Sequence, residues 1–262
     1  MRGFDLNAST NLGYVLMGGA PPVTKKARFL PKRRVRKYNK FFSYKNENRE
    51  GRNFRYKNFG RSNSYNTRFT RSDFTFVNFE KAIMKYCGFN GATFHGAEFK
   101  NTNLKGSRFK GSSFRDTIFY HTNLAKTDFS GAVFENVVFI GTNVRNIQGI
   151  SQTASGISVH SSIPAVQLTD NLRAALFGTK RNAYIVRSGV LCLDRGDQLF
   201  LVNIKRLLDR FTEDELTTGL KLATQQIRTN FYTLSYLIAF FDRAGSQGWS
   251  TGDTSASSLS PP

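Results

Sequence analysis

The segment FNGATFHGAEFKNTNLKGSR, residues 89–108, places a large apolar side chain at every fifth position. The same period runs without a slip from Phe69 to Val144, and twelve of its sixteen positions are Phe. Two residues before each of them the side chain is Ala, Ser, Thr, Cys or Val. Helices repeat about every 3.6 residues and strands about every two, so neither accounts for a period of five. Self-similarity of this kind predicts a repeat architecture.

The period of five predicts a solenoid in which each unit sends one large and one small side chain inward. Successive coils then stack the large side chains in columns and pair their backbone groups with each other. Burial of each large side chain stabilises the fold by about 1.5–3 kcal/mol. A single unit has no neighbour to pack against, so we expect the units to fold only as a stack.

The individual units also resemble the pentapeptide-repeat family, whose unit reads small, polar, Phe or Leu and then two variable residues. Examples are ATFHG (92–96), AEFKN (97–101), TNLKG (102–106), SRFKG (107–111) and TDFSG (127–131). The resemblance implies a right-handed quadrilateral β-helix of about twenty residues per coil, so that residues 67–146 form about four coils. We therefore predict a mainly β fold with a basic N-terminal arm and a mostly helical C-terminal module.

The solenoid is expected to span residues 51–146, with regular coils from about Thr67. Phe54 and Phe59 keep the phase, but the small positions before them hold Arg52 and Lys57. Burying these cations without partners is costly. We therefore expect residues 51–66 to form an irregular lead-in that covers the exposed edge of the first coil.

One face of the predicted coil combines cations with amides. Lys85 and Lys105 follow core positions on successive coils, and Asn103 and Asn123 precede them. A row of cations beside a row of amides suits an anionic backbone. The alternative is a solvated surface in which the Asn side chains form a hydrogen-bonded ladder.

A second face carries four outward apolar side chains on adjacent coils. A patch of this kind is expected to be covered. We favour docking of the C-terminal segment of the same chain, and a second copy or another protein partner is the alternative. The patch consists of Ile118, Tyr120, Val138 and Ile140.

The C-terminal third has a different composition and predicts helices. Residues 147–167 are polar and are expected to be a linker, residues 168–244 a mostly helical module that caps the solenoid or dimerises, and residues 245–262 a disordered tail. Within the module we expect helices over 170–177, over 198–210 and after a capping box at Thr212–Glu215. The β-branched segment 183–193 is compatible with a strand or hairpin.

The first 68 residues hold most of the net positive charge of the chain, with 17 Lys and Arg against 3 Asp and Glu. Residues 1–50 are therefore expected to form a basic, partly disordered arm. Cations that neutralise phosphates and aromatic rings that stack on bases suit nucleic acid or another polyanion, with RNA and DNA both open. The alternative is that these aromatic residues pack under the first coil. The candidate contacts are Lys25, Lys26, Arg28, Lys32, Arg33, Arg34, Arg36, Lys37, Tyr38, Lys40 and Phe41, together with Lys85 and Lys105.

Catalytic signals are weak in this sequence. Of the three histidines, His95 and His121 have no acidic partner at a triad spacing, and Cys87 occupies a small inward position. No grouping has metal-ligand spacing, and the glycines at 88, 91, 96, 106, 111, 131 and 141 are interpreted as repeat turns. We therefore expect a non-catalytic scaffold without metal or cofactor.

The longest apolar run, 231–241, is too short to span a bilayer, and with no secretory signal at the N-terminus we expect a cytoplasmic protein.

The resemblance offers a second kind of partner. Some pentapeptide-repeat proteins bind type II topoisomerases by imitating duplex DNA with an acidic surface on a dimeric rod. Here residues 69–144 carry nine Lys and Arg against six Asp and Glu, and the whole chain has a net charge of +20. A DNA mimic requires rows of carboxylates, so this charge disfavours mimicry and leaves a protein-interaction scaffold as the alternative function, including a homodimer through the C-terminal helices.

Overall fold

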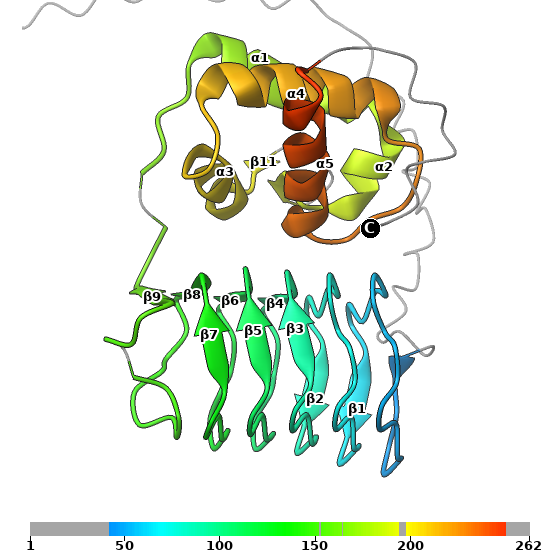
Figure 1. Cartoon of the computed structure of the whole chain (residues 1–262), viewed down its shortest axis with the longest axis vertical. Helices are drawn as coiled ribbons and strands as arrows, with labels where there is room; N and C mark the ends of the chain where they lie inside the picture. Colours follow the sequence, from blue (N-terminus) through cyan, green and yellow to red (C-terminus); the bar gives the residue numbers. More distant parts are fainter. Residues whose placement is uncertain (1–41, 152, 164, 194–197, 250–262) are drawn as a thin grey trace, which may run out of the picture. The chain divides into compact units, whose positions relative to one another are not determined.

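The computed structural model describes residues 42–151, 153–163, 165–193 and 198–249. The proposed contacts in the basic arm up to Phe41, and most of the expected C-terminal tail, lie outside these residues. The described part contains a parallel β-solenoid followed by a helical module (Figure 1).

Short parallel strands build the solenoid, and strands that pair with each other are offset by twenty residues along the chain. Phe94 pairs with Phe114, and Phe114 with Phe134. Isolated bridges at Arg68↔Gly88 and Gly88↔Arg108 extend the pairing to a further side of each coil. The strands are β1 (Asn63–Tyr65), β2 (Ile83–Lys85), β3 (Thr93–His95), β4 (Glu98–Lys100), β5 (Ser113–Arg115), β6 (Ile118–Tyr120), β7 (Val133–Glu135), β8 (Val137–Ile140) and β9 (Ile157–His160).

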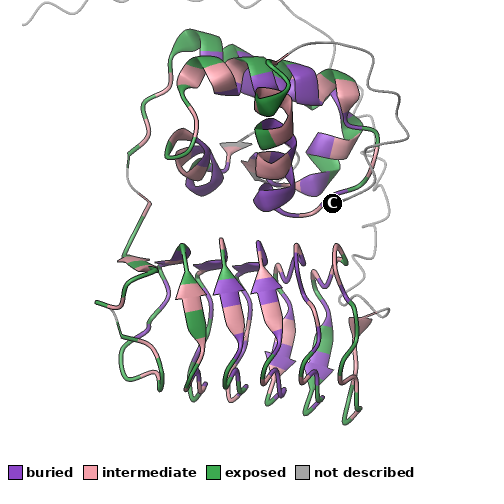
Figure 2. Ribbon diagram, viewed as in Figure 1, coloured by how far each residue is buried: buried purple, intermediate pink, exposed green. Residues whose placement is uncertain are grey.

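Columns of stacked Phe rings fill the interior, as the sequence predicted. The Phe94 ring lies 5.1 Å from the Phe74 ring and 4.9 Å from the Phe114 ring, with interplanar angles of 5° and 6°. All three residues are buried, and Figure 2 shows buried residues along the coils. Offset rings at this spacing add to the stability that burial alone provides.

The small inward side chains bind one coil to the coil before it. Ser107 Oγ donates to the carbonyl oxygen of Met84 at 2.6 Å, and Thr122 Oγ1 donates to that of Phe99 at 2.6 Å. A buried hydroxyl without a partner is costly. These bonds explain how Ser and Thr serve at inward positions beside Ala.

The solenoid begins earlier than expected and has about five coils. Asn48 pairs with Arg68 and Asn53 with Asp73, so the predicted irregular lead-in is in fact a paired coil. Arg52 and Lys57 are exposed, while the Phe residues that follow them are buried. Among the described residues no coil lies upstream of this one, so long side chains at its small positions can turn to solvent.

The segment expected to be a linker, 147–167, contributes a strand. Strand β9 pairs in parallel with β8, and Val159 lies opposite Phe139. The four-stranded sheet therefore has the order β4-β6-β8-β9. Val159 stands twenty residues after Phe139 and so continues the core phase.

The helical module contains α1 (Asp170–Gly178), η2 (Thr179–Arg181), α2 (Ala183–Ser188), β10 (Cys192–Leu193), β11 (Gln198–Leu199), α3 (Leu201–Leu208), α4 (Glu213–Gln226) and α5 (Leu234–Ser246). The strand or hairpin expected over 183–193 is wrong for most of that range, because Asn182 caps a helix there. Its side-chain oxygen accepts from the backbone N–H groups of Tyr184 and Ile185. The capping box at Thr212 and Glu215 is confirmed.

The module packs on the sheet that contains the apolar patch. Phe200 and Val202 form a buried cluster with Ile118 and Ile140. The Phe200 ring meets the Tyr120 ring edge-on, with centroids 5.4 Å apart. Docking of the C-terminal segment, the first choice from the sequence, is confirmed, and the patch is not a free surface for another protein.

Candidate nucleic-acid interface

From the second coil onward, positive charge is concentrated on two adjacent sides of the solenoid, which we call the basic side: residues 63–70, 83–90, 103–110, 123–130 and 143–148. The basic side has seven Lys and Arg, and Asp128 is its one acidic residue. The remaining parts of the same coils, 71–142 without these ranges, have four Lys and Arg against five Asp and Glu. The seven cations are Arg68, Lys85, Lys105, Arg108, Lys110, Lys126 and Arg145.

Most of these cations have no acidic partner among the residues that the structure describes. Within the described part of the chain, only Lys110 of the seven forms an ion pair, with Asp128 at 3.2 Å. Burial acts to raise the pKa of Asp128, but hydrogen bonds from Ser130 and from Lys110 outweigh it and lower that pKa. The other six cations have no ion-pair partner among the described residues.

Asn side chains form hydrogen bonds with the backbone of the cations that follow the core positions. Asn103 Oδ1 accepts from the Lys105 N–H at 3.2 Å, and Asn143 Oδ1 accepts from the Arg145 N–H at 3.0 Å. These are Asx turns, which Asn forms readily. The Asn oxygens of this row thus accept hydrogen bonds within their own coil, unlike the hydrogen-bonded Asn ladder of the alternative interpretation.

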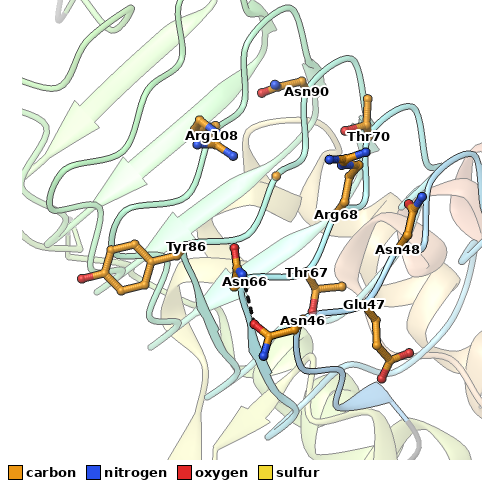
Figure 3. A pocket seen from close by; sticks show the side chains of 11 residues that line it. Asn46, Glu47, Asn48, Asn66, Thr67, Arg68, Thr70, Tyr86, Asn90 and Arg108 are labelled. Carbon is orange, nitrogen blue, oxygen red and sulfur yellow. Dashed lines mark hydrogen bonds between the residues drawn. The ribbon is translucent and has the colours of Figure 1, made fainter.

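A hollow of about 500 Å³ lies on the basic side between Arg68 and Arg108 (Figure 3). Gly88 pairs with both arginines through the parallel ladder and has no side chain to fill the space between them. A Cβ at Gly88 meets no heavy atom within 4 Å. Its φ lies outside the left-handed region, unlike that of the corner residues Gly91 and Gly106. The interpretation of Gly88 as a repeat turn is therefore wrong, and we call this hollow the Gly88 notch.

Two exposed tyrosines border the basic side. Tyr65 is 46% exposed and Tyr86 is 42% exposed, and their ring centroids lie 5.6 Å apart at an interplanar angle of 72°. The Tyr86 ring rests on Gly106, where a Cβ would come within 2.4 Å of a ring carbon. Aromatic rings held beside cations can stack on nucleic-acid bases. The role of Tyr86 was not visible from the repeat pattern, because it occupies a variable position.

The predicted site residues fall into three groups by their location in the structure. Lys85 and Lys105 lie on neighbouring coils of the basic side, as expected. The arm residues from Lys25 to Phe41 lie outside the described residues. The apolar patch lies under the helical module and is separate from the basic side.

The described residues show neither a metal-ligand cluster nor a reactive thiol at Cys87. They contain no group of three His, Cys, Asp or Glu side chains that could hold a metal ion. Cys87 is fully buried, and burial raises the pKa of its thiol to about 12, which disfavours a nucleophilic thiolate. Among the helices that the structure describes, none has the length and apolar character needed to cross a bilayer.

Comparison with known proteins identifies the repeat. Residues 87–138 match the family model described as pentapeptide repeats (9 copies). This central part of the solenoid is therefore built of pentapeptide repeats. No curated protein matches the sequence.

Several solved structures resemble the chain at low identity. Rfr23, a pentapeptide repeat protein from the cyanobacterium Cyanothece, is 18% identical with a TM-score of 0.25, over 40% of this chain and 89% of Rfr23. HetL from the cyanobacterium Nostoc is 12% identical with a TM-score of 0.27, over 40% of this chain and 48% of HetL. QnrB1, a plasmid-mediated fluoroquinolone resistance protein, is 13% identical with a TM-score of 0.23, over 51% of this chain and 93% of QnrB1.

Proposed function

We propose that this chain is a non-catalytic pentapeptide-repeat scaffold that binds nucleic acid through the basic side of its solenoid. The observation that carries the proposal is the excess of seven cations over one acid on that side. Six of those cations have no ion-pair partner among the described residues. The helical module packs elsewhere, on the sheet of β4, β6, β8 and β9.

The repeat itself suits an extended polyanion. Adjacent coils rise by about 4.8 Å, so Lys85 and Lys105 place charges at regular short intervals along the solenoid. Each phosphate that such a cation neutralises releases a condensed counterion, which favours binding at low salt. An extended row of cations therefore predicts affinity that falls steeply as salt rises.

The N-terminal arm would add to this surface. Residues 1–41 contain ten Lys and Arg and a single acid, Asp5. Basic segments of this kind commonly bind polyanions without reading sequence. We propose that the arm increases affinity, while the solenoid provides the fixed part of the interface.

A salt titration tests the proposal. The full chain is titrated by fluorescence anisotropy against a labelled oligonucleotide of about twelve nucleotides. A variant that combines Arg68→Ala, Lys85→Ala, Lys105→Ala and Arg108→Ala is expected to lower the salt slope by about 3, at roughly 0.7–0.9 per lost contact. The matched control, Lys81→Ala with Arg115→Ala, removes cations from the other sides and should leave the slope unchanged.

Two results would overturn the proposal. One is affinity of the full chain that does not change between low and moderate salt. The other is an equal loss in the basic-side variant and in its control. A chain lacking residues 1–41 measures the arm separately, because this deletion leaves the first described coil intact.

A further inference from the structure

We propose that the Gly88 notch and the Tyr86 ring together form a subsite for one nucleotide of a single strand. One phosphate sits in the notch between Arg68 and Arg108, and an unpaired base stacks on Tyr86. This inference rests on the proposed function and deepens it, because it selects single-stranded over duplex nucleic acid.

The notch has the cationic groups that a phosphate-binding site needs. Arg68, Gly88 and Arg108 occupy the same position on three successive coils, so the two arginines flank the empty position from both sides, about 10 Å apart at the backbone. The guanidinium group presents a planar fork of donors that matches phosphate oxygens. Neither arginine has an ion-pair partner among the described residues, so no internal salt bridge has to break before phosphate binds.

The rim of the notch is polar and contains one carboxylate. Asn66 and Thr70 line it, and the Asn66 side chain is fixed by donating to Asn46 Oδ1 at 3.0 Å (Figure 3). Glu47 also lines the notch, but its carboxylate is paired with the Arg49 guanidinium at 2.6 Å. The local field therefore remains favourable to an anion.

Tyr86 provides the surface that distinguishes a single strand from a duplex. It belongs to the same coil as Gly88, two residues away, and borders the notch. The ring is supported by Gly106 on the next coil and meets Tyr65 edge-on. An exposed ring on a rigid support can stack on a base that is already unpaired, whereas bases in a duplex are engaged with each other. A duplex could reach only the cations.

Gly88 makes the notch testable without disturbing the fold. Its backbone does not require glycine, and the space beside it is open. Gly88→Gln should therefore fill the notch while the coil stays intact. Gly178 at the end of α1 offers a matched control, because it also lacks a left-handed φ and has open space beside it.

The experiment compares three labelled probes of equal length with the full chain: oligo(dT) of about twelve nucleotides, an abasic strand with the same phosphates, and a duplex. Tyr86→Ala should weaken oligo(dT) binding at least about fivefold and leave abasic and duplex binding unchanged. Tyr86→Phe should retain wild-type affinity. Gly88→Gln should weaken both single-stranded probes at least about threefold, and Gly178→Gln should weaken neither. Circular dichroism verifies that each variant is folded.

The outcomes separate this subsite from the broader proposal. If Tyr86→Ala and Gly88→Gln bind oligo(dT) like the wild type while the variant lacking four basic-side cations is impaired, the subsite is wrong and the basic interface stands. Equal losses with the abasic strand and with oligo(dT) in Tyr86→Ala would remove the stacking role. If the wild-type chain binds none of the three probes, the proposed function itself fails.

Discussion

The carboxylate of Glu98, on strand β4 of the solenoid, accepts a hydrogen bond from the backbone N–H of Leu234 at the start of helix α5, at 2.5 Å. The two residues are 136 positions apart. The first N–H groups of a helix have no partner within it, so the solenoid supplies one for α5. The same carboxylate pairs with Lys100 at 3.0 Å, and both side chains are almost completely buried. Glu98 thus joins the helical module to the coils.

Glu98→Ala should destabilise the protein strongly. The substitution leaves Lys100 buried without a counter-charge and removes the acceptor for Leu234, which predicts a loss of about 3–5 kcal/mol. Chemical denaturation measures it. The double variant Glu98→Leu with Lys100→Met removes both charges and should be less destabilised than Glu98→Ala. A single variant as stable as the wild type would contradict the role of the buried pair.

Phe94→Ala should test the ring columns. The Phe94 ring contacts buried rings on the coils before and after it, so its removal leaves a cavity and should cost about 3–5 kcal/mol. Phe94→Leu should cost less, because Leu104 already occupies an equivalent position. Urea unfolding gives both values. As a surface control, Arg108→Ala should change stability by less than about 0.5 kcal/mol.

Cys87 should resist alkylation in the folded protein. At a thiol pKa of about 12, the reactive thiolate is at least about a thousandfold scarcer at pH 8 than for an exposed cysteine. Iodoacetamide labelling followed by mass spectrometry of peptides should therefore find Cys87 unmodified until denaturant is added. Labelling of Cys87 under native conditions at the rate of a free thiol would contradict its burial.

His95 should make stability depend on pH. Burial, followed by the nearby Arg115 guanidinium, lowers the pKa of His95 below its usual value of about 6.5. Arg115 Nη2 lies 3.3 Å from Nδ1 of the ring, and Ser113 Oγ lies 3.1 Å from Nε2, which suits a neutral ring that donates from Nε2.

The sign of this dependence follows from proton linkage. Below about pH 6.5 the unfolded chain binds a proton at His95 before the folded chain does. His95 therefore contributes stability above that pH, and this contribution is lost as the pH falls through the folded pKa. His95→Gln should reduce the drop in Tm between pH 7.5 and pH 5, whereas His160→Gln, at an exposed position, serves as the control. An unchanged drop in His95→Gln would contradict the lowered pKa.

The sequence predicted the interior better than the ends. The phase of five residues placed Phe94 and its equivalents correctly, because burial of a ring column depends only on the repeat. The prediction of an irregular segment around Arg52 was wrong, because a terminal coil has an open end where a cation can turn to solvent. The sequence prediction also failed at β9, where Val159 kept the phase but its neighbours lacked the repeat signature. Helix α2 was missed because a single cap, Asn182, outweighs the β-branched composition that follows.

The candidate interface was predicted in part. Lys85 and Lys105 were identified because stacking at twenty residues places them on one row. The Gly88 notch was missed because a glycine on a flat side looks the same in sequence as a glycine at a corner. Only the φ angle, which lies outside the left-handed region at Gly88, separates the two. The sequence predicted that the C-terminal segment covers Ile118, but it did not identify Phe200 as the residue that packs there.

The twenty-residue register of the ladder restricts how this chain can change in length over evolution. Gain or loss of a whole coil would lengthen or shorten the basic side, and every later residue would stay on the same side of the solenoid. Gain or loss of one five-residue unit would instead turn all downstream rows by a quarter circle. Glu98 would then face away from Leu234, or the arginines would no longer line up. Natural insertions and deletions in related solenoids should therefore be multiples of twenty residues. This applies wherever the change lies between the coils that contact the helical module and the coils that form the basic side.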